Sequence, residues 1–402
     1  MPRLSTPLAI LCGLTAMAST AAAQDWTATA SLPGTGRHHP VNFTLDGYGY
    51  VVTGSSGGNT TDFFRYDPGT DAWTVLTDFP GPARSYSYGG AYDGKGYLGF
   101  GQGTSYLRDL WEYDPVAESW TELAPCPGTA RTHPAFVITD DGKIFVGMGG
   151  SAGGNLNDWW EYDIATNVWA QKAFLPGPNR HHPYYFNIGD TPYVGFGHGA
   201  GIFKDFYRFE RDTESWTRMT DFPSEGRVAG TQFSYGGKGY VLSGEGDDHV
   251  QFPTGEFWEY DPDTDSWTQL APHPGSSRWA PGNFVIDDTV YLMCGLSTSR
   301  LESDMWKFQF MDPAAVEEPV LPNQIAFRVS PNPVTGQQLR IFDTPEAAHS
   351  MRLLDVQGRE VSGFGYSAGL AELPTGLASG QYFLVLRSQG GTETARAITV
   401  LR

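Results

Sequence analysis

The stretch Arg84–Trp120, RSYSYGGAYDGKGYLGFGQGTSYLRDLWEYDPVAESW, contains one complete copy of a unit that recurs along the chain. It holds four short segments rich in aromatic and β-prone residues, at 85–91, 97–101, 109–113 and 120–123. Asp93-Gly94-Lys95-Gly96 separates the first two as a hairpin turn, and Asp114-Pro115 begins the turn before the fourth. The pattern predicts a small sheet of four antiparallel strands.

Two series of residues mark the copies of this unit. Each copy begins with an arginine: Arg37, Arg84, Arg131, Arg180, Arg227 and Arg278. A tryptophan series runs beside it: Trp26, Trp73, Trp120, Trp169, Trp216 and Trp267. Both series step by 47, 47, 49, 47 and 51 residues. A period near 50 in a β-rich chain predicts a β-propeller in which each copy forms one blade.

The sixth copy is incomplete at its end. It begins at Arg278, stops near Met311 and lacks the fourth-strand tryptophan, whereas Trp26 lies 47 residues before Trp73 and has no copy of its own. We therefore expect the N-terminal segment Asp25–Leu32 to complete the last blade. The sequence predicts a closed ring of six blades over residues 24–311.

Composition and the first residues bear on location and partners. The formal net charge of −19, with no basic run, disfavours nucleic acid. Arg3, the apolar run Leu8–Met17 and the small residues Ala21–Ala23 predict a signal peptide over 1–23. That apolar run is too short to span a bilayer, so we expect no transmembrane segment and a secreted or surface-attached protein.

The pattern changes at Asp312. Residues 312–323 are predicted to form a linker, and residues 324–402 a second, small β-domain without repeats. Three motifs mark this region: Ser330-Pro331-Asn332-Pro333, the segment Asp355–Val361, and Leu377 followed by Gly380-Gln381-Tyr382.

Both regions are similar to known families. The first resembles the kelch repeats of the galactose oxidase-like superfamily in its arginine-headed first strand, its glycine after the second strand, its Tyr-Asp-Pro turn and its fourth-strand tryptophan. The three C-terminal motifs resemble the C-terminal sorting domain of type IX secretion substrates in the Bacteroidetes. Together the resemblances imply an all-β chain: a six-bladed kelch-type β-propeller closed by an N-terminal strand, then an Ig-like β-sandwich recognised by the type IX export machinery.

The starts of the first strands provide the candidate site. Strand one is innermost in a propeller, so these residues should converge at one mouth of the central channel. The predicted ligand-binding residues are Arg37, His39, Arg84, Tyr86, Arg131, His133, Arg180, His182, Arg227, Arg278 and Trp279. They suit a carboxylated or hydroxylated ligand such as a glycan. Two alternatives stay open: His39, His133 and His182 as metal ligands, and the repeated arginines as structural anchors between blades.

These observations favour a binding or interaction module for a glycan or a protein over an enzyme. We assign no catalytic residue, no metal and no cofactor. The kelch resemblance also implies an alternative, a sugar-converting enzyme of the N-acetylneuraminate epimerase type. The related copper oxidases need a Tyr–Cys cross-link, and neither Cys126 nor Cys294 lies in a segment that resembles that site.

Overall fold

The computed structural model describes residues 25–310, 328–330, 334, 336–342, 348–355, 359–367, 369–388 and 393–400. The expected signal peptide and linker lie outside these ranges. Within them the chain is all-β, apart from one 3₁₀ turn, η1 (Asp247–His249). No helix formed by the described residues is long and apolar enough to cross a membrane.

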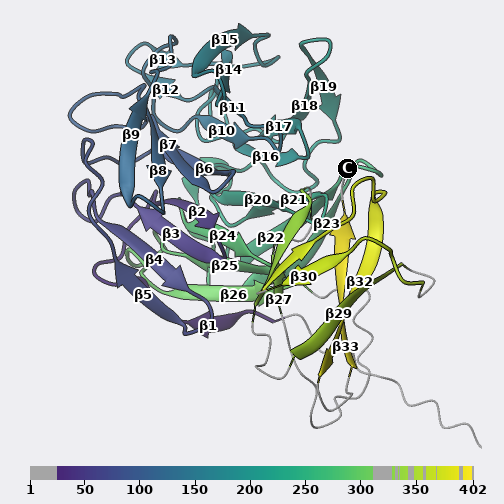
Figure 1. Cartoon of the computed structure of the whole chain (residues 1–402). Helices are drawn as coiled ribbons and strands as arrows, with labels where there is room; N and C mark the ends of the chain where they lie inside the picture. The colour runs from purple at the N-terminus through teal and green to yellow at the C-terminus, as the bar shows by residue number, and fades with distance from the viewer. Residues whose placement is uncertain are drawn as a thin grey trace, which may run out of the picture.

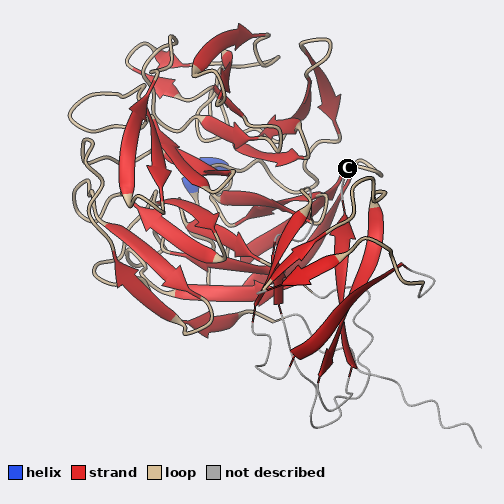
Figure 2. Cartoon of the chain, viewed as in Figure 1, coloured by secondary structure: helices blue, strands red, loops and turns tan. Residues whose placement is uncertain are grey.

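Six antiparallel sheets of four strands form the propeller (Figures 1 and 2). The first three blades are β2 (Val41–Leu45), β3 (Tyr48–Val52), β4 (Phe63–Asp67) and β5 (Ala72–Val75); β6 (Tyr88–Tyr92), β7 (Lys95–Gly99), β8 (Leu110–Asp114) and β9 (Ser119–Leu123); and β10 (Ala135–Ile138), β11 (Lys143–Gly147), β14 (Trp159–Asp163) and β15 (Val168–Lys172). A two-stranded hairpin, β12 (Gly150–Ser151) and β13 (Gly154–Asn155), interrupts the third blade.

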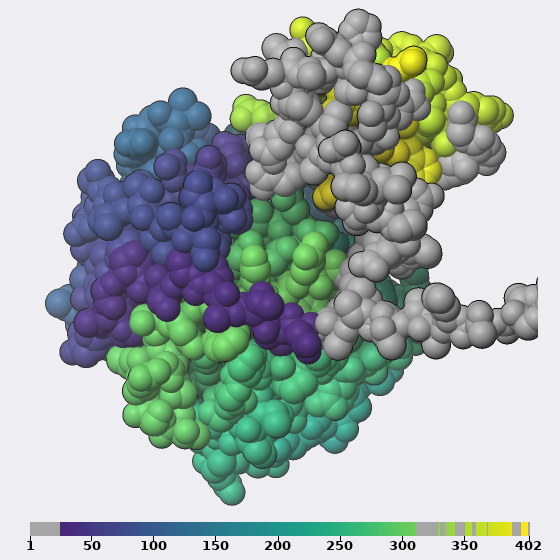
Figure 3. Space-filling model, turned by 90° about the horizontal axis from the view of Figure 1, so that it is seen from below, coloured from purple at the N-terminus to yellow at the C-terminus, as the bar shows by residue number. Residues whose placement is uncertain are grey.

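The remaining blades follow the same order, and the last one closes the ring. They are β16 (Tyr184–Ile188), β17 (Thr191–Gly195), β18 (Phe206–Glu210) and β19 (Ser215–Met219); β20 (Thr231–Tyr235), β21 (Lys238–Leu242), β22 (Gly255–Asp261) and β23 (Ser266–His273); and β24 (Gly282–Ile286), β25 (Thr289–Met293), β26 (Met305–Gln309) and β1 (Thr27–Thr29). The pairing of β1 with β26 confirms the predicted closure. Figure 3 shows the N-terminal segment, in purple, against the light-green last blade.

The tryptophan series joins neighbouring blades. The indole Nε1 of Trp73 donates to the carbonyl of Ala30 at 2.9 Å, one blade back. Trp26, Trp169, Trp216 and Trp267 donate to a backbone carbonyl of the preceding blade in the same way. Trp120 is the exception, since its buried Nε1 has no partner. A bond repeated at five of the six blade borders explains why the tryptophan recurs.

The C-terminal region forms two sheets that share a core. One sheet contains β27 (Arg328–Ser330), β28 (Gln338–Phe342), β31 (Leu370–Glu372) and β30 (Gly365–Ser367), and the other β29 (Ala348–Asp355), β32 (Gly380–Ser388) and β33 (Glu393–Val400). Leu339 and Ile341 from the first sheet pack in one cluster with Leu353, Leu384 and Ile398 from the second. This arrangement is the predicted small β-sandwich.

Trp26, which bonds across the closing border, and Trp120, which makes no such bond, give a matched test of ring closure. Trp26→Phe removes a hydrogen bond across the closing border, whereas Trp120→Phe removes a donor that has no acceptor. We expect Trp26→Phe to be less stable than Trp120→Phe by about 1 kcal/mol. Urea unfolding of both variants measures this difference, and equal losses would contradict a role of the Trp26 bond in closure.

Candidate functional site

The six heading arginines are buried in internal ion pairs. Arg84 donates from both terminal nitrogens to Asp109, with 2.6 Å between Nη2 and Oδ2, and from Nη1 to the carbonyl of Phe100. Arg37, Arg131, Arg180 and Arg278 make the same contacts with Asp62, Asp158, Asp205 and Asp304. Arg227 has one such bond, to Glu256. All six arginine residues are only 0–5% exposed, so their guanidinium groups are enclosed by the blades.

These contacts correspond to the alternative that the sequence left open, in which the repeated arginines are structural anchors. Ligand contact by Arg37, Arg84, Arg131, Arg180, Arg227 and Arg278 stays a prediction, and in this structure each guanidinium is paired within its own blade. The backbone of the same residues also links the blades: the carbonyl of Arg131 accepts from the N–H of Gly101 in the preceding blade, at 2.9 Å. Gly101 has a φ of 90°, and a Cβ there would lie 2.5 Å from the carbonyl oxygen of Ser85. The bond therefore requires glycine.

The residue two positions after each arginine faces the axis. These residues are His39, Tyr86, His133, His182, Ala229 and Ala280, and we call them the axial ring. All six have φ between 47° and 61°, in the left-handed region. Backbone hydrogen bonds join members of the ring, for example from the N–H of His182 to the carbonyl of His133 at 3.1 Å and from His39 to Ala280 at 2.9 Å. The blades thus hold six side chains around one point.

Three histidines meet in this ring. The ligand atoms of His39, His133 and His182 lie within 4.8 Å of one another. The Nε2 atoms of His39 and His182 are 2.8 Å apart, and the rings of His133 and His182 have centroids 3.5 Å apart. Nε2 of His133 is buried without a hydrogen-bond partner. Burial, followed by repulsion from neighbouring imidazoles, lowers the pKa of all three histidines well below the usual value.

More aromatic side chains surround this trio. His38 contacts His39, with 2.8 Å between their Nδ1 atoms. Tyr86 and Trp279 both pack against the ring of His39, and Tyr86 also packs against His133. On the other side the rings of His181, His198 and His249 follow one another at centroid distances of 5.1 and 4.6 Å. Seven of the nine histidines in the chain therefore gather at this mouth, and the predicted convergence of His39, Tyr86, His133, His182 and Trp279 is present.

A channel of about 320 Å³ runs inside the ring. Its wall includes, in every blade, the first-strand residues five and seven positions after the arginine, and it also includes Tyr88 and Thr231, four positions after their arginines. The first set is Asn42, Gly89, Phe136, Tyr185, Gln232 and Asn283, and the second is Thr44, Ala91, Ile138, Asn187, Ser234 and Val285. His39 and Ala280 of the axial ring line it too. The second set is half-buried throughout, whereas Phe136, Tyr185 and Asn283 are buried.

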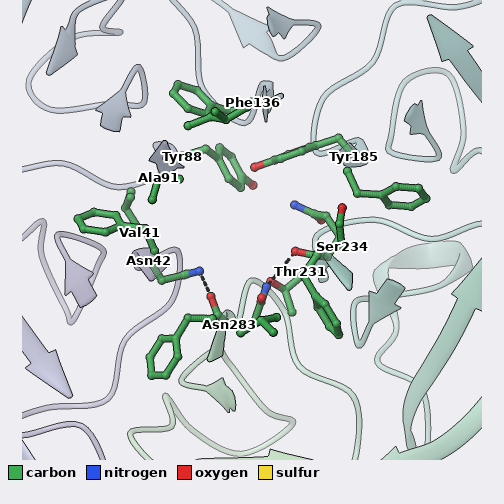
Figure 4. Close-up of a pocket in the computed structure, with 18 of the residues that line it drawn as sticks. Val41, Asn42, Tyr88, Ala91, Phe136, Tyr185, Thr231, Ser234 and Asn283 are labelled. Atoms are coloured by element: carbon green, nitrogen blue, oxygen red, sulfur yellow. Dashed lines mark hydrogen bonds between the residues drawn. The ribbon is translucent and has the colours of Figure 1, made fainter. Parts of the chain in front are cut away.

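The two sides of this channel differ in chemistry. Figure 4 shows Tyr88, Phe136 and Tyr185 together on one side and Asn42, Asn283, Thr231 and Ser234 on the other. The side-chain amide of Asn283 donates to the hydroxyl of Thr231 and to the backbone carbonyl of Gln232. The backbone carbonyl of Asn283 accepts a hydrogen bond from the side-chain amide of Asn42. Burial raises the pKa of Tyr88 and of Tyr185, so both hydroxyls stay protonated. An aromatic wall therefore faces a wall of amides and hydroxyls.

Sequence reasoning missed this wall. The predicted site included residues only at the start of strand one. It left out positions five and seven, which the arginine register and the period of two within a strand identify in every copy. The signal was present in the sequence, because five of the six residues at position five carry an amide or an aromatic ring.

The hairpin turns beyond the second set make that end of the channel acidic. Asp46, Asp93, Asp140, Asp141, Asp190, Asp287 and Asp288 lie in the turns between first and second strands. Burial, then the charges of Asp190 and Asp141, raises the pKa of Asp140. The end of the channel opposite the histidines thus has a negative field.

Comparison with known proteins agrees with the fold. The chain is a six-bladed β-propeller with an appended β-sandwich. No family model matches it. The solved structure of YjhT is similar with a TM-score of 0.58 at 15% identity, over 69% of this chain and 96% of that one. The N-acetylneuraminate epimerase of Pasteurella multocida (strain Pm70) is 28% identical over 128 residues, 31% of this chain, and the match spans 32% of that relative's length.

Single substitutions separate anchors from axial residues. Arg180→Ala would leave the Asp205 carboxylate and the Phe196 carbonyl without their partner, so we expect a loss of about 3–5 kcal/mol in unfolding free energy. His182→Ala introduces the residue that blades five and six carry at the same ring position and leaves no charge unpaired, so we expect a smaller loss than for Arg180→Ala. Chemical denaturation tests both. Comparable losses in the two variants would contradict the assignment.

The buried imidazoles predict acid sensitivity. Burial lowers the pKa of His38 and of His181 to about 4. Below pH 6.5 the unfolded chain binds protons that the folded chain excludes, so stability is lost as pH falls from 6.5 towards 4. His181→Val, which copies Val228 of blade five, should lower the proton uptake on unfolding by about one. Urea midpoints between pH 7 and 5, with a chelator present, measure this; parallel curves for variant and wild type would refute it.

Proposed function

We propose that the protein is a secreted or cell-surface binding module that holds a neutral sugar in the propeller channel. The observation that carries the proposal is the two-sided channel wall. Aromatic rings pack against the C–H face of a sugar, while amides and hydroxyls bind its hydroxyl groups. The volume of about 320 Å³ lies at the lower end of the range for small-molecule sites and suits a single sugar ring.

The charges around the channel favour a neutral sugar over an acidic one. The heading arginines, which would have bound a carboxylate, are neutralised by their own Asp and Glu partners. The axial histidines are neutral, and the far end of the channel is acidic. These features favour a neutral ligand over the carboxylated one that the sequence suggested. The small volume of the channel favours a sugar over a protein.

A second candidate is a sugar-converting enzyme, favoured by the local similarity to an N-acetylneuraminate epimerase. That relative's named substrate is an acid, and the channel wall of this chain contains no arginine or lysine among its lining residues. Conversion of one sugar form into another, followed by NMR with added sugars, distinguishes an enzyme from a binder.

We also propose export by the type IX route, on the basis of the N-terminal segment and the motifs of the C-terminal β-sandwich. Arg359 of the second motif forms an ion pair with Asp355 at 2.7 Å. Deletion of residues 324–402 from the gene should leave the propeller inside the outer membrane, as cell fractionation would show.

A matched pair of substitutions tests the binding proposal. Gln232→Met removes one amide from the channel wall, and Gln269→Met makes the same change on the exposed outer strand β23 of the same blade. On a glycan array with the mature protein, we expect capture of neutral sugars to fall about tenfold or more for Gln232→Met and to persist for Gln269→Met. Equal capture by both, or preferred capture of acidic sugars, would overturn the proposal.

A further inference from the structure

The axial histidines are arranged as a metal site. We propose that His39, His133 and His182 bind one divalent transition-metal ion at the channel axis, in a site that the sequence analysis left unassigned. The inference deepens the proposed function and rests on it only for the ligand that would approach the ion; the metal site itself stands on the geometry of the three imidazoles.

The first argument is distance. Three imidazole nitrogens bound to one tetrahedral ion, each about 2.0–2.1 Å from it, lie about 3.3 Å from one another. The observed ligand atoms are all within 4.8 Å, and the Nε2 atoms of His39 and His182 are 2.8 Å apart. Small side-chain rotations, with the backbone unchanged, bring all three onto one ion. The left-handed backbone and the hydrogen bonds between ring members keep that backbone in place.

The second argument is the lack of other partners. Nε2 of His133 is buried and makes no hydrogen bond. The Nε2 atoms of His39 and His182 face each other, so one of the two must carry the proton that joins them. An ion bound at this point would accept a lone pair from each of the three nitrogens, which satisfies the unpaired one and replaces that proton.

The third argument is the surrounding shell. His38 contacts Nδ1 of His39, which leaves Nε2 of His39 available to an ion. The ring members of blades five and six are Ala229 and Ala280, whose small side chains leave room beside the trio. The bulky group on that side is Trp279 of blade six, whose ring centroid lies 4.6 Å from that of His39 and 6.0 Å from that of His182. His39 and Ala280 both line the channel. Three protein ligands with an open fourth position towards a binding channel are typical of zinc sites that contact a substrate or water.

The donor set selects the metal class. Three imidazoles with no carboxylate or thiolate suit zinc, copper, nickel or iron and do not suit calcium or magnesium, which need oxygen ligands. A hydroxyl group of a sugar in the channel would be the group that reaches the open coordination position of the ion.

The fold itself supplies the test variants. His133→Ala and His182→Ala introduce the residue present at the same ring position in blades five and six. Tyr86→Ala is the matched control, because Tyr86 occupies the ring and contacts His133 at a centroid distance of 4.4 Å but offers no imidazole. Full-length protein stripped with a chelator is titrated calorimetrically with zinc chloride in the absence of sugar, and cobalt absorption reports the coordination geometry.

We expect one zinc ion per chain, tetrahedral cobalt bands, at least 100-fold weaker binding for each histidine variant, and affinity within a few-fold of wild type for Tyr86→Ala. No stoichiometric zinc binding, or equal binding by the histidine variants, would overturn the proposal. Loss of zinc binding through His198→Ala alone would also do so, since it would place the ion among the outer histidines. Gln232→Met should bind zinc normally, so failure of sugar capture and failure of the metal site are distinguishable.

Discussion

The arginine that opens each blade is the interaction on which the propeller depends. Its guanidinium ties the first strand to the third through a carboxylate and to the end of the second through a carbonyl. Its own carbonyl accepts a hydrogen bond from a glycine of the preceding blade, and the last of these bonds, from Gly295 to Arg37, joins the sixth blade to the first. Buried charges are costly unless fully paired, and here the pairing fixes where each first strand begins.

Because this anchor repeats, function can reside only in what differs between blades. The positions two, five and seven residues after the arginine form stacked layers around the axis, and the backbone of the first layer is left-handed in all six blades. The side chains change from histidine to alanine in the first layer and from amide to aromatic in the next. A symmetric scaffold thereby produces an asymmetric site, with the imidazoles on one side and the small residues on the other.

Blade five shows how far the anchor can vary. Glu256 replaces the usual aspartate and takes one hydrogen bond from Arg227, whose Nε and Nη1 lack partners. Phe222 and Phe252 stack on its guanidinium, with ring centroids 4.2 and 4.8 Å from Cζ. Cation–π contact therefore offsets part of the missing hydrogen bonding in this blade.

The sequence predicted the fold almost completely, since the blade number and the closing strand follow from counting Arg278 and Trp26. It predicted the site less well. Arginine and histidine stand two residues apart in the same segment, yet the first points back into its blade and the second towards the axis, a difference set by the left-handed φ of His39 and its equivalents. Hydrophobic pattern and residue type do not encode that turn, because histidine, tyrosine and alanine all adopt it here.

The position of the closing strand near the N-terminus determines when the ring can close during synthesis. Thr27–Thr29 leave the ribosome among the first residues of the propeller, and their partner β26 follows about 280 residues later. Until then the sixth sheet has a free edge and the first blade has no neighbour on one side. The first strand to be made can pair only after the last strand of the ring has been made, so the ring stays open during its own translation and closes through a long-range contact.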